Sequence, residues 1–379
     1  MFVVGFSTMA LIIILSVFNG LEGLLKDLYG SFDPEIKIES VKGKSFGLEA
    51  DFIQKINDIP GVDQVVFVIE DNAYVKYNNS EMVAVIKGVS ANYPKVNKLE
   101  SKIVEGKLNF WNGNIPMAVV GRGIQYSLGV STADNYSTMQ VYYPKNLRSK
   151  SLNMSNTMTK MNVQVAGVFA IERQFDEKYI IVPITFASEL FSYKNRVTSL
   201  EVSALKGYDV LKVQANLKNF IGPDFKVQNA DEQHDIILRT VKIEKLFVFI
   251  TFIFIIGVSS INIFFALSML AIDKKKDIGM LFSMGATQKQ VRSIFLAEGA
   301  IISLSGAVVG LLMGLVVILL QQHVGLFRMG LQTSVIDFYP VELQLQDFLF
   351  TAGSIIAITF LVSIRPAIMA SKFSEASSL

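Results

Sequence analysis

Long apolar runs near both ends of the chain contrast with a middle region in which apolar and polar positions alternate. The apolar runs occupy residues 2–18, 246–272, 294–320 and 345–368. A helix needs roughly 20 residues to cross a hydrocarbon core about 30 Å thick, so the last three runs predict membrane spans. The first run is short for a span at about 1.5 Å per residue. We therefore expect a first membrane helix within residues 1–25 that is clipped at its N-terminal end.

A cleaved signal peptide is the competing interpretation of the first apolar run. A secretory signal has a basic residue before its apolar part and a small-x-small cleavage site after it. Here the first basic residue is Lys26, and no such site follows the run. The pattern therefore favours a membrane helix.

Residues 26–244 carry the patterns of a water-soluble domain. Alternation with a period of two predicts strands, and apolar positions three to four residues apart predict helices. The strands fall at residues 36–39, 62–69, 74–77, 82–86, 139–143, 162–169, 179–182, 199–203 and 225–228, and the helices at 48–57, 122–128, 184–191 and 209–220. Because strands and helices are mixed without a regular β-α-β order, an α+β domain is favoured. The predicted fold class is an α+β membrane protein with this large mixed domain between the first and second of four transmembrane helices.

Charges in the two short loops between the later spans give an orientation. Residues 273–292 contain Lys274, Lys275, Lys276, Lys289 and Arg292 against Asp273 and Asp277, whereas residues 321–344 contain only Arg328 against Asp337 and Glu342. Short loops rich in Lys and Arg stay in the cytoplasm. This rule predicts a cytoplasmic loop at 273–292, a cytoplasmic C-terminal tail, an extracytoplasmic domain at 26–244, and three spans within residues 245–379.

The composition excludes several kinds of chemistry. The chain has 35 Lys and Arg against 33 Asp and Glu, and this near balance argues against nucleic acid as a partner. It contains no cysteine and only two histidines, which are far apart in the sequence, so no thiolate or histidine metal site is expected. The nearest approach to a phosphate-binding loop, residues 43–45, lacks the upstream glycine. We expect this chain to bind no cofactor and no metal and to be no enzyme.

Two polar segments of the middle domain are candidate sites. Residues 144–161 are basic and rich in Ser, Asn and Thr, and they lie between two predicted strands. A loop of this length is uncommon in a compact domain and is usually either functional or disordered, and the sequence favours neither. The acidic pair Asp176-Glu177 is a conceivable catalytic group, but a solvated loop between two strands is the simpler interpretation.

The predicted cytoplasmic loop contains a short amphipathic segment. Ile278, Leu281 and Phe282 would face inward while the flanking lysines face the lipid headgroups, which suits a helix lying at a membrane surface. Gly285 can take the left-handed position that ends a helix. Thr287-x-x-Gln290 is a capping box that would restart the chain as the third span. We interpret the segment as a docking element, and an ordinary charged loop is the alternative.

The third span carries small residues at four-residue spacing. Gly306, Gly310 and Gly314 form this stripe. Such spacing lets helix backbones approach closely. The pattern predicts tight helix packing and leaves open whether the partner helix belongs to this chain or to a second subunit.

Taken together, these elements resemble the FtsX/MacB-like permeases of ABC transporters, and among them the lipoprotein-releasing permeases of the LolC/LolE type. The resemblance covers essentially the whole chain. The segments that carry it are LSVFNGLE at 15–22, VVGRGIQYSLGV at 119–130, VAGVFA at 165–170, IEKLFVFI at 243–250, KKKDIGMLFSMGATQKQVRSIFLAEG at 274–299, YPVEL at 339–343 and SIRPAIMA at 363–370. The terminal SKFSEASSL departs from the Pro followed by Glu-Ala-Leu-Arg that the family usually has there.

The resemblance implies a periplasmic MacB-like core at 26–244, an FtsX-like permease domain at 245–379, and residence in the bacterial inner membrane. It also implies a pair of permease subunits, identical or related, each bound to a separate LolD-like ATPase subunit that uses ATP and Mg. The residues that it implies for coupling to this ATPase are Lys276, Asp277, Ile278, Gly279, Met280, Leu281, Gly285, Ala286 and Thr287.

The resemblance further implies a cargo and a route. A triacylated lipoprotein would enter from the membrane lipid laterally between the first two helices, contact Ile14, Leu15 and Phe18, and pass to a periplasmic LolA-like chaperone. Pro144, Arg148 and Lys150 fall where the chaperone-binding hook of LolC-type permeases occurs. The alternatives are a MacB-like exporter, an FtsX-like regulator of a periplasmic partner, and a membrane-anchored sensor without an ATPase.

Overall fold

The computed structural model describes residues 2–96, 98–132, 137–145, 158–328 and 338–372. They form two compact units. We call Leu25–Asp235 the α+β unit, and we call residues 2–24 together with the described residues from Ile236 onward the helix unit. The boundary between the units falls near the end of the first helix and at the start of the long helix that begins at Asp235.

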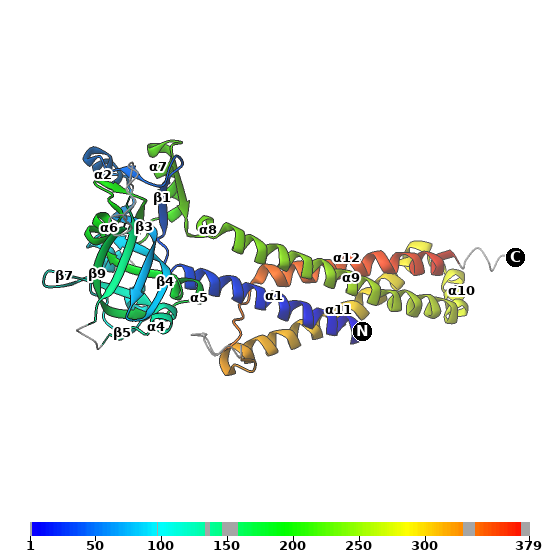
Figure 1. The fold of residues 1–379 in the computed structure, drawn as a ribbon. Coiled ribbons are helices and arrows are strands. Elements are labelled where there is room, and N and C mark those ends of the chain that lie inside the picture. The colour runs from blue at the N-terminus through cyan, green and yellow to red at the C-terminus, as the bar shows by residue number, and fades with distance from the viewer. Residues whose placement is uncertain (1, 97, 133–136, 146–157, 329–337, 373–379) are drawn as a thin grey trace. The chain divides into compact units, whose positions relative to one another are not determined.

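The α+β unit is built on one large, mostly antiparallel sheet (Figure 1). Its strands are β1 (Ile36–Ser40), β3 (Val62–Tyr77), β4 (Ser80–Val89), β5 (Ile103–Gly106), β6 (Trp111–Asn112), β7 (Ile115–Gly121), β8 (Met139–Pro144), β9 (Met158–Phe169), β10 (Tyr179–Pro183), β12 (Ser199–Ala204) and β13 (Phe225–Asn229). The order is β13-β1-β12-β3-β4-β10-β7-β9-β5, with β6 beside β7. β8 pairs with both β3 and β9. The paired strands β3, β4, β10, β7, β9 and β8 therefore form a closed ring. A separate small pair joins β2 (Phe46–Gly47) to β11 (Arg196–Val197).

Short helices cover this sheet. They are α2 (Ala50–Asn57), α3 (Tyr93–Val96), the 3₁₀ turn η1 (Lys98–Lys102), α4 (Arg122–Leu128), α5 (Arg173–Asp176), α6 (Ile184–Phe191), α7 (Val210–Ile221) and α8 (Ala230–Gln233). The four longer ones are those that the apolar spacing predicts. The sequence also explains where they end, since Gly129 and Gly222 take positive φ angles at the C-termini of α4 and α7.

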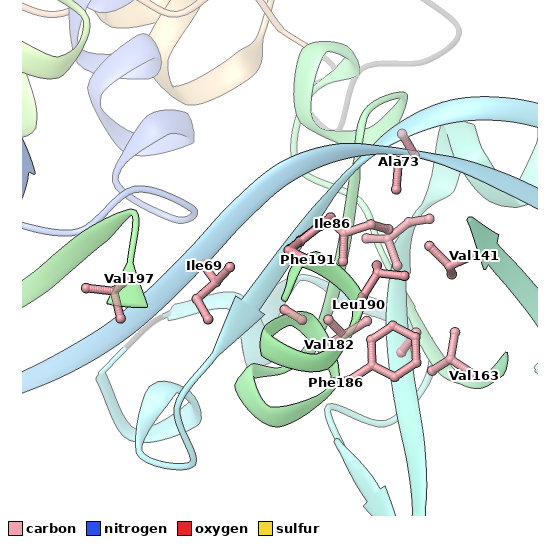
Figure 2. Packing of buried hydrophobic residues seen from close by; sticks show 14 of the residues in the cluster. Ile69, Ala73, Ile86, Val141, Val163, Val182, Phe186, Leu190, Phe191 and Val197 are labelled. Carbon is pink, nitrogen blue, oxygen red and sulfur yellow. The ribbon is translucent and has the colours of Figure 1, made fainter. Parts of the chain in front are cut away.

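The two faces of the sheet bury different apolar cores. Along β3, Val65 and Ile69 face one core, whereas Val66 and Val68 face the other, as the period-two alternation requires. The larger core receives α6, whose Phe186, Leu190 and Phe191 insert beside the strand residues (Figure 2). The smaller core is rich in aromatic rings and contains Tyr29, Phe32, Tyr93, Phe169 and Phe175.

The helix unit contains four helices that are long and apolar enough to cross a membrane. They are α1 (Phe2–Tyr29), α9 (Asp235–Asp273), α11 (Gln288–Val324) and α12 (Leu345–Ser371), and the short α10 (Lys275–Ser283) follows α9. Leu11 and Leu15 of α1 share one apolar cluster with residues of the other three long helices. Many large apolar side chains remain exposed on these helices, including Phe247, Phe254, Phe265, Phe350 and Phe360. Such exposure is expected for helices whose outer surface faces lipid, so the fold is that of a multi-pass membrane protein with a mixed α+β domain.

Two boundaries differ from those predicted by the sequence. The predicted loop 144–161 is too long, because β8 continues to Pro144, which pairs with Met158 at the start of β9. The polar side chains of Thr159 and Lys160 do not interrupt this strand, since their partners Tyr143 and Tyr142 continue the ladder. The first apolar run is also only part of its helix, because α1 continues to Tyr29 and is 28 residues long.

Candidate functional site

The short helix α10 is held to the bundle by its apolar side. Ile278 is buried in a cluster with Ala271 of α9 and with Val291 and Phe295 of α11. Phe282 packs against the same cluster and Leu281 is half-buried. This inward side agrees with the amphipathic pattern in the sequence.

The other side of α10 is exposed and mixes apolar and charged groups. Met280 and Met284 are exposed and four residues apart, so they lie on one side of the turn. Lys276 and Asp277 are exposed in the preceding turn. Exposed methionines are adaptable contact groups for a protein partner. The geometry therefore offers a small docking surface that is anchored beneath by Ile278.

The break between α10 and α11 has the predicted chemistry. Gly285 has a φ of +94°. The amide of Gly285 donates to the carbonyl of Phe282, and that of Ala286 donates to the carbonyl of Leu281, the pattern of a Schellman ending. Thr287 and Gln290 then form the predicted capping box at the start of α11, in which the Gln290 side chain accepts from the Thr287 amide at 2.7 Å. No atom lies within 4 Å of the position that a Cβ at Gly285 would take. Glycine is therefore favoured here by the positive φ angle and not by a lack of space.

The glycine stripe of α11 packs against α1 of the same chain. A Cβ at Gly310 would overlap the carbonyl oxygen of Gly5, and a Cβ at Gly314 would overlap Ile12. A Cβ at Gly5 would in turn lie 3.0 Å from the carbonyl oxygen of Gly306. The partner helix that the sequence leaves open is therefore intramolecular.

The three residues of α1 named for cargo contact do not share one environment. Ile14 and Phe18 are half-exposed and four residues apart, so they lie on one side of the helix. Leu15 is 1% exposed and belongs to the apolar cluster between the helices. Of these three residues, Ile14 and Phe18 are accessible in this conformation and Leu15 is not.

A polar triad that sequence reasoning missed joins three helices. The Nζ of Lys245 in α9 lies 2.7 Å from Oδ1 of Asn19 in α1 and 2.9 Å from Oδ1 of Asp347 in α12. Asn19 donates through Nδ2 to Oδ2 of Asp347 at 2.6 Å. All three lie at the end of the bundle remote from α10, which we call the distal end. The only signal in the sequence is that each borders an apolar run.

A strap formed by residues 339–342 crosses α1 beside the triad. The amide of Glu342 donates to the carbonyl of Ser16 at 2.9 Å, and Asn19 also donates to the Glu342 carbonyl at 3.3 Å. A Cβ at Gly20 would overlap the backbone of Pro340. The strap coincides with the segment YPVEL that carries part of the family resemblance.

The α+β unit buries a second set of charged groups. Lys87 and Glu201 are each 3% exposed at the side chain and pair at 2.7 Å. The Nζ of Lys87 also lies 4.5 Å from the ring centre of Phe32 and 5.4 Å from that of Tyr93. Burial by itself lowers the pKa of Lys87, but the negative charges around it, led by Glu201, outweigh this and hold that pKa well above its usual value. The lysine is thus a buried cation.

A polar cavity of about 290 Å³ lies in the same unit. Its walls include Asp33, Lys37, Lys178 and His234. His234 bonds to Asp33 at 2.5 Å and stacks on Tyr29 with ring centres 3.8 Å apart. Cations and anions occur together in these walls, so the cavity has no single sign of charge.

Asp176 is not the solvated loop residue that the sequence suggested. It ends α5, is half-buried, and accepts a hydrogen bond from the amide of Ile171 at 2.9 Å. Burial raises its pKa to about 6, against the opposing effect of its backbone hydrogen bonds. The neighbouring Glu177 is exposed and pairs with Arg173. Asp176 therefore has a structural role at the end of α5.

Of the three residues predicted to contact the chaperone, Pro144 alone lies within the described part of the chain. Pro144 is exposed at the end of β8, in a strand rather than in the expected loop. Arg148 and Lys150 lie outside the described residues. Among the described residues, no group of three or more His, Cys, Asp and Glu side chains is arranged to hold a metal ion.

Comparison with known proteins gives two family matches. Residues 1–220 match the MacB-like periplasmic core domain, and residues 249–374 match the FtsX-like permease C-terminal family. The protein named lipoprotein-releasing system transmembrane protein LolC from Buchnera aphidicola is 23% identical, over 96% of this chain and 88% of the relative. The LolE protein of Haemophilus influenzae is 23% identical over 58% of this chain and 55% of the relative. Among solved structures, the periplasmic region of MacB from Actinobacillus actinomycetemcomitans aligns with a TM-score of 0.37 and 14% identity, over 57% of this chain and 97% of that one.

Proposed function

Because the chain belongs to the FtsX/MacB-like family of ABC transporter permeases, we propose that it is the permease subunit of a lipoprotein-releasing system in the bacterial inner membrane. The observation that carries the proposal is the similarity to a LolC protein along nearly the whole of both chains. The α+β unit is then the periplasmic domain, and α10 lies on the cytoplasmic side.

The proposed energy source is a separate ATPase subunit of the LolD type that binds ATP and Mg. Its docking surface on this chain is the exposed side of α10, with Met280 and Met284 as apolar contacts and Lys276 and Asp277 beside them. Because Ile278 fixes α10 to α9 and α11, a displacement of α10 would move the start of one span and the end of another. This anchoring supports a coupling role for the whole segment 276–287.

The proposed cargo is an acylated lipoprotein that leaves the outer leaflet of the membrane. Ile14 and Phe18 offer apolar surface on α1, and each buried CH₂ of an acyl chain would contribute about 0.8 kcal/mol. The lipoprotein would pass to a periplasmic chaperone of the LolA type. A second permease subunit, identical or related, would complete the route.

Co-purification in mild detergent, with mass spectrometry of bound proteins and lipids, tests the proposal. We expect an ATPase subunit together with acylated lipoprotein, and ATP-dependent release of that lipoprotein from proteoliposomes to a soluble chaperone. An ATPase accompanied by a hydrolase activator or an efflux partner, without lipoprotein, would favour the other members of the family. Absence of any ATPase, with its expression verified, would contradict a transporter function.

The docking surface has its own matched test. The double substitution Met280→Glu and Met284→Glu places two charges on the exposed side of α10 and should remove the ATPase subunit from the purified complex. Met158→Glu alters an exposed methionine of the α+β unit and should retain it. Retention of the ATPase by the double variant would disprove the assignment of this surface.

A further inference from the structure

The triad of Asn19, Lys245 and Asp347 is closed on itself. Each member bonds to the other two, at distances of 2.6 to 3.0 Å. Asn19 uses both ends of its amide, its oxygen accepting from Lys245 and its nitrogen donating to Asp347. Asn19 and Asp347 are 2% and 7% exposed, and the Lys245 side chain is 24% exposed. A buried carboxylate is costly without its counter-ion, so the three helices are strongly favoured to stay together here.

Further contacts hold α1 to the strap and α12 more firmly than they hold α9 to the triad. On one side, the backbone bond from Glu342 to Ser16 and the close approach of Pro340 to Gly20 also hold α1 to the strap. The strap leads directly into α12, which carries Asp347. On the other side, α9 joins the triad through the long side chain of Lys245, and one turn away Lys242 of α9 pairs with Glu22 of α1. If the triad opens, the backbone bond still joins α1 to the strap that leads into α12, whereas α9 is held here through side chains and is therefore the helix that separates.

The position of the triad relates it to the proposed cargo surface. Asn19 lies one turn beyond Leu15, which is buried while its neighbours Ile14 and Phe18 are half-exposed. Leu15 is packed in a cluster to which α9 contributes Ile256, Ile263 and Leu267. Separation of α9 from α1 at the distal end would therefore uncover Leu15 and join it to the surface already formed by Ile14 and Phe18.

We propose that the triad is a latch on the seam between α1 and α9, and that its release by movement of Lys245 admits the acyl chains of the cargo to Leu15. The inference rests on the proposed function for the nature of the cargo. The latch is closed in this structure, because all three contacts are made.

A second ion pair between the same two helices supplies a matched control. Lys242 of α9 lies 3.7 Å from Glu22 of α1, one turn away from the triad, and the two side chains are 58% and 19% exposed. A long ion pair whose lysine is exposed contributes little to helix association. Lys242→Met therefore removes the same charge from the same helix without touching the latch.

The absence of cysteine from the chain allows a direct measurement of opening. Leu15→Cys would be the single thiol of this chain, in a complex with its ATPase subunit reconstituted in lipid nanodiscs without lipoprotein. A membrane-permeant maleimide would report its accessibility without nucleotide. We expect Lys245→Met to increase the labelling rate about tenfold, the change that a shift of about 1.4 kcal/mol in the closed state produces. Lys242→Met should remain within about twofold of the parent, since the Lys242 side chain is exposed and its ion pair is long.

Further variants and a control measurement distinguish the opening of a latch from a general loss of structure. Lys245→Arg keeps the charge and should restore slow labelling, while all variants should retain the helical circular dichroism of the parent. Equal labelling in Lys245→Met and its parent, or an equal rise in Lys242→Met, would overturn the latch. A labelling response combined with no lipoprotein release by the unmodified complex would instead overturn the proposed function and leave the latch standing.

Discussion

The α+β unit and the helix unit each bury an ion pair, and the two pairs are held by different kinds of structure. Lys87 and Glu201 lie on strands β4 and β12, with β3 between them, and backbone ladders fix all three strands. Lys245 and Asp347 lie on helices whose backbone hydrogen bonds are internal to each helix. The sheet would keep its strands together if its ion pair were lost, whereas the helices are joined at the distal end through side chains and the strap.

This difference predicts two kinds of response to the loss of one partner. A buried charge without its counter-ion is destabilising in both units. In the sheet the ladder prevents local separation, so the whole penalty falls on the free energy of unfolding. In the bundle, part of the penalty can be relieved by opening, which lets water reach the free charge. Burial alone therefore does not decide whether an ion pair stabilises a fold or controls a movement.

The largest effect is expected for Glu201→Leu. This substitution removes the carboxylate that pairs directly with Lys87 and leaves that cation among the rings of Phe32 and Tyr93. Breaking a buried pair in this way costs about 3–5 kcal/mol. Thermal unfolding of the purified chain in detergent, followed through the β-sheet circular dichroism, should show a correspondingly lower transition temperature for the α+β unit.

The double variant Lys87→Met with Glu201→Leu sharpens this test. Replacing both charges by apolar groups of similar size is often neutral or stabilising, because no charge is left to desolvate. Most of the lost stability should therefore return. If the double variant is as unstable as Glu201→Leu alone, the penalty comes from packing rather than from the unpaired cation.

The next effect concerns close packing in the helix unit. Gly310→Ala adds a Cβ that would overlap the carbonyl of Gly5, and a rigid helix backbone cannot yield easily. Overpacking of this kind costs about 1–3 kcal/mol. Gly353→Ala is the matched control, since nothing lies within 4 Å of its Cβ position in α12. Thermal unfolding of the helical signal should show a loss for Gly310→Ala and no loss for Gly353→Ala. Equal behaviour would mean that α1 does not pack on the stripe.

The helix unit shows how far the sequence can predict a membrane protein. Apolar length predicts the four long helices, and local rules predict Gly285 and the capping box at Thr287, because a cap depends on residues three or four positions apart. The glycine stripe predicts close packing but not its partner, which is set by a helix about three hundred residues away in the chain. The triad was missed for the same reason, since Asn19 and Asp347 are unremarkable until the fold brings them together.

The α+β unit shows the same limit in another form. Period-two alternation predicts most strands, but it does not show that Lys87 and Glu201 are buried, each being 3% exposed at the side chain. A single charged residue in a strand is normally read as solvent-facing, and only the register of three strands reveals that two such residues neutralise each other. The extension of β9 through Thr159 and Lys160 was missed because polar residues are compatible with a strand when its partner is in place.

A smaller effect on stability is expected from Asp176, a half-buried carboxylate of the α+β unit. Burial raises the pKa of Asp176 to about 6, from about 3.8 in the unfolded chain. Folding therefore favours the protonated form, so the contribution of Asp176 to stability should be largest below pH 4 and fall as the pH rises through about 6. After allowance for solvent screening at this half-buried site, the loss is roughly 1–2 kcal/mol.

Asp176→Asn should remove this part of the pH dependence while keeping an oxygen that accepts from the Ile171 amide. The measurement is the difference in unfolding temperature between variant and parent from pH 4 to pH 7. Glu177→Gln alters the adjacent exposed carboxylate and should leave the parent profile unchanged. A pH-independent difference for Asp176→Asn would contradict the raised pKa.

The smallest effect is expected where the helix unit depends on a local, exposed interaction. Thr287→Ala removes the hydroxyl that accepts from the Gln290 amide and leaves the first turn of α11 without its cap. Loss of an N-cap costs about 1 kcal/mol. Since Ile278, Val291 and Phe295 still pack α10 on α11, the fold should persist and only the first turn should fray. Hydrogen exchange at the amide of Gln290 should then accelerate about fivefold, the factor that this free energy allows.

Thr240→Ala is the control for this prediction. It removes an exposed hydroxyl that bonds to a carbonyl of its own helix, and it should leave exchange at Gln290 unchanged. Were Thr287→Ala instead to unfold α10, the docking segment would depend on its cap, and the burial of Ile278 would not be what anchors it.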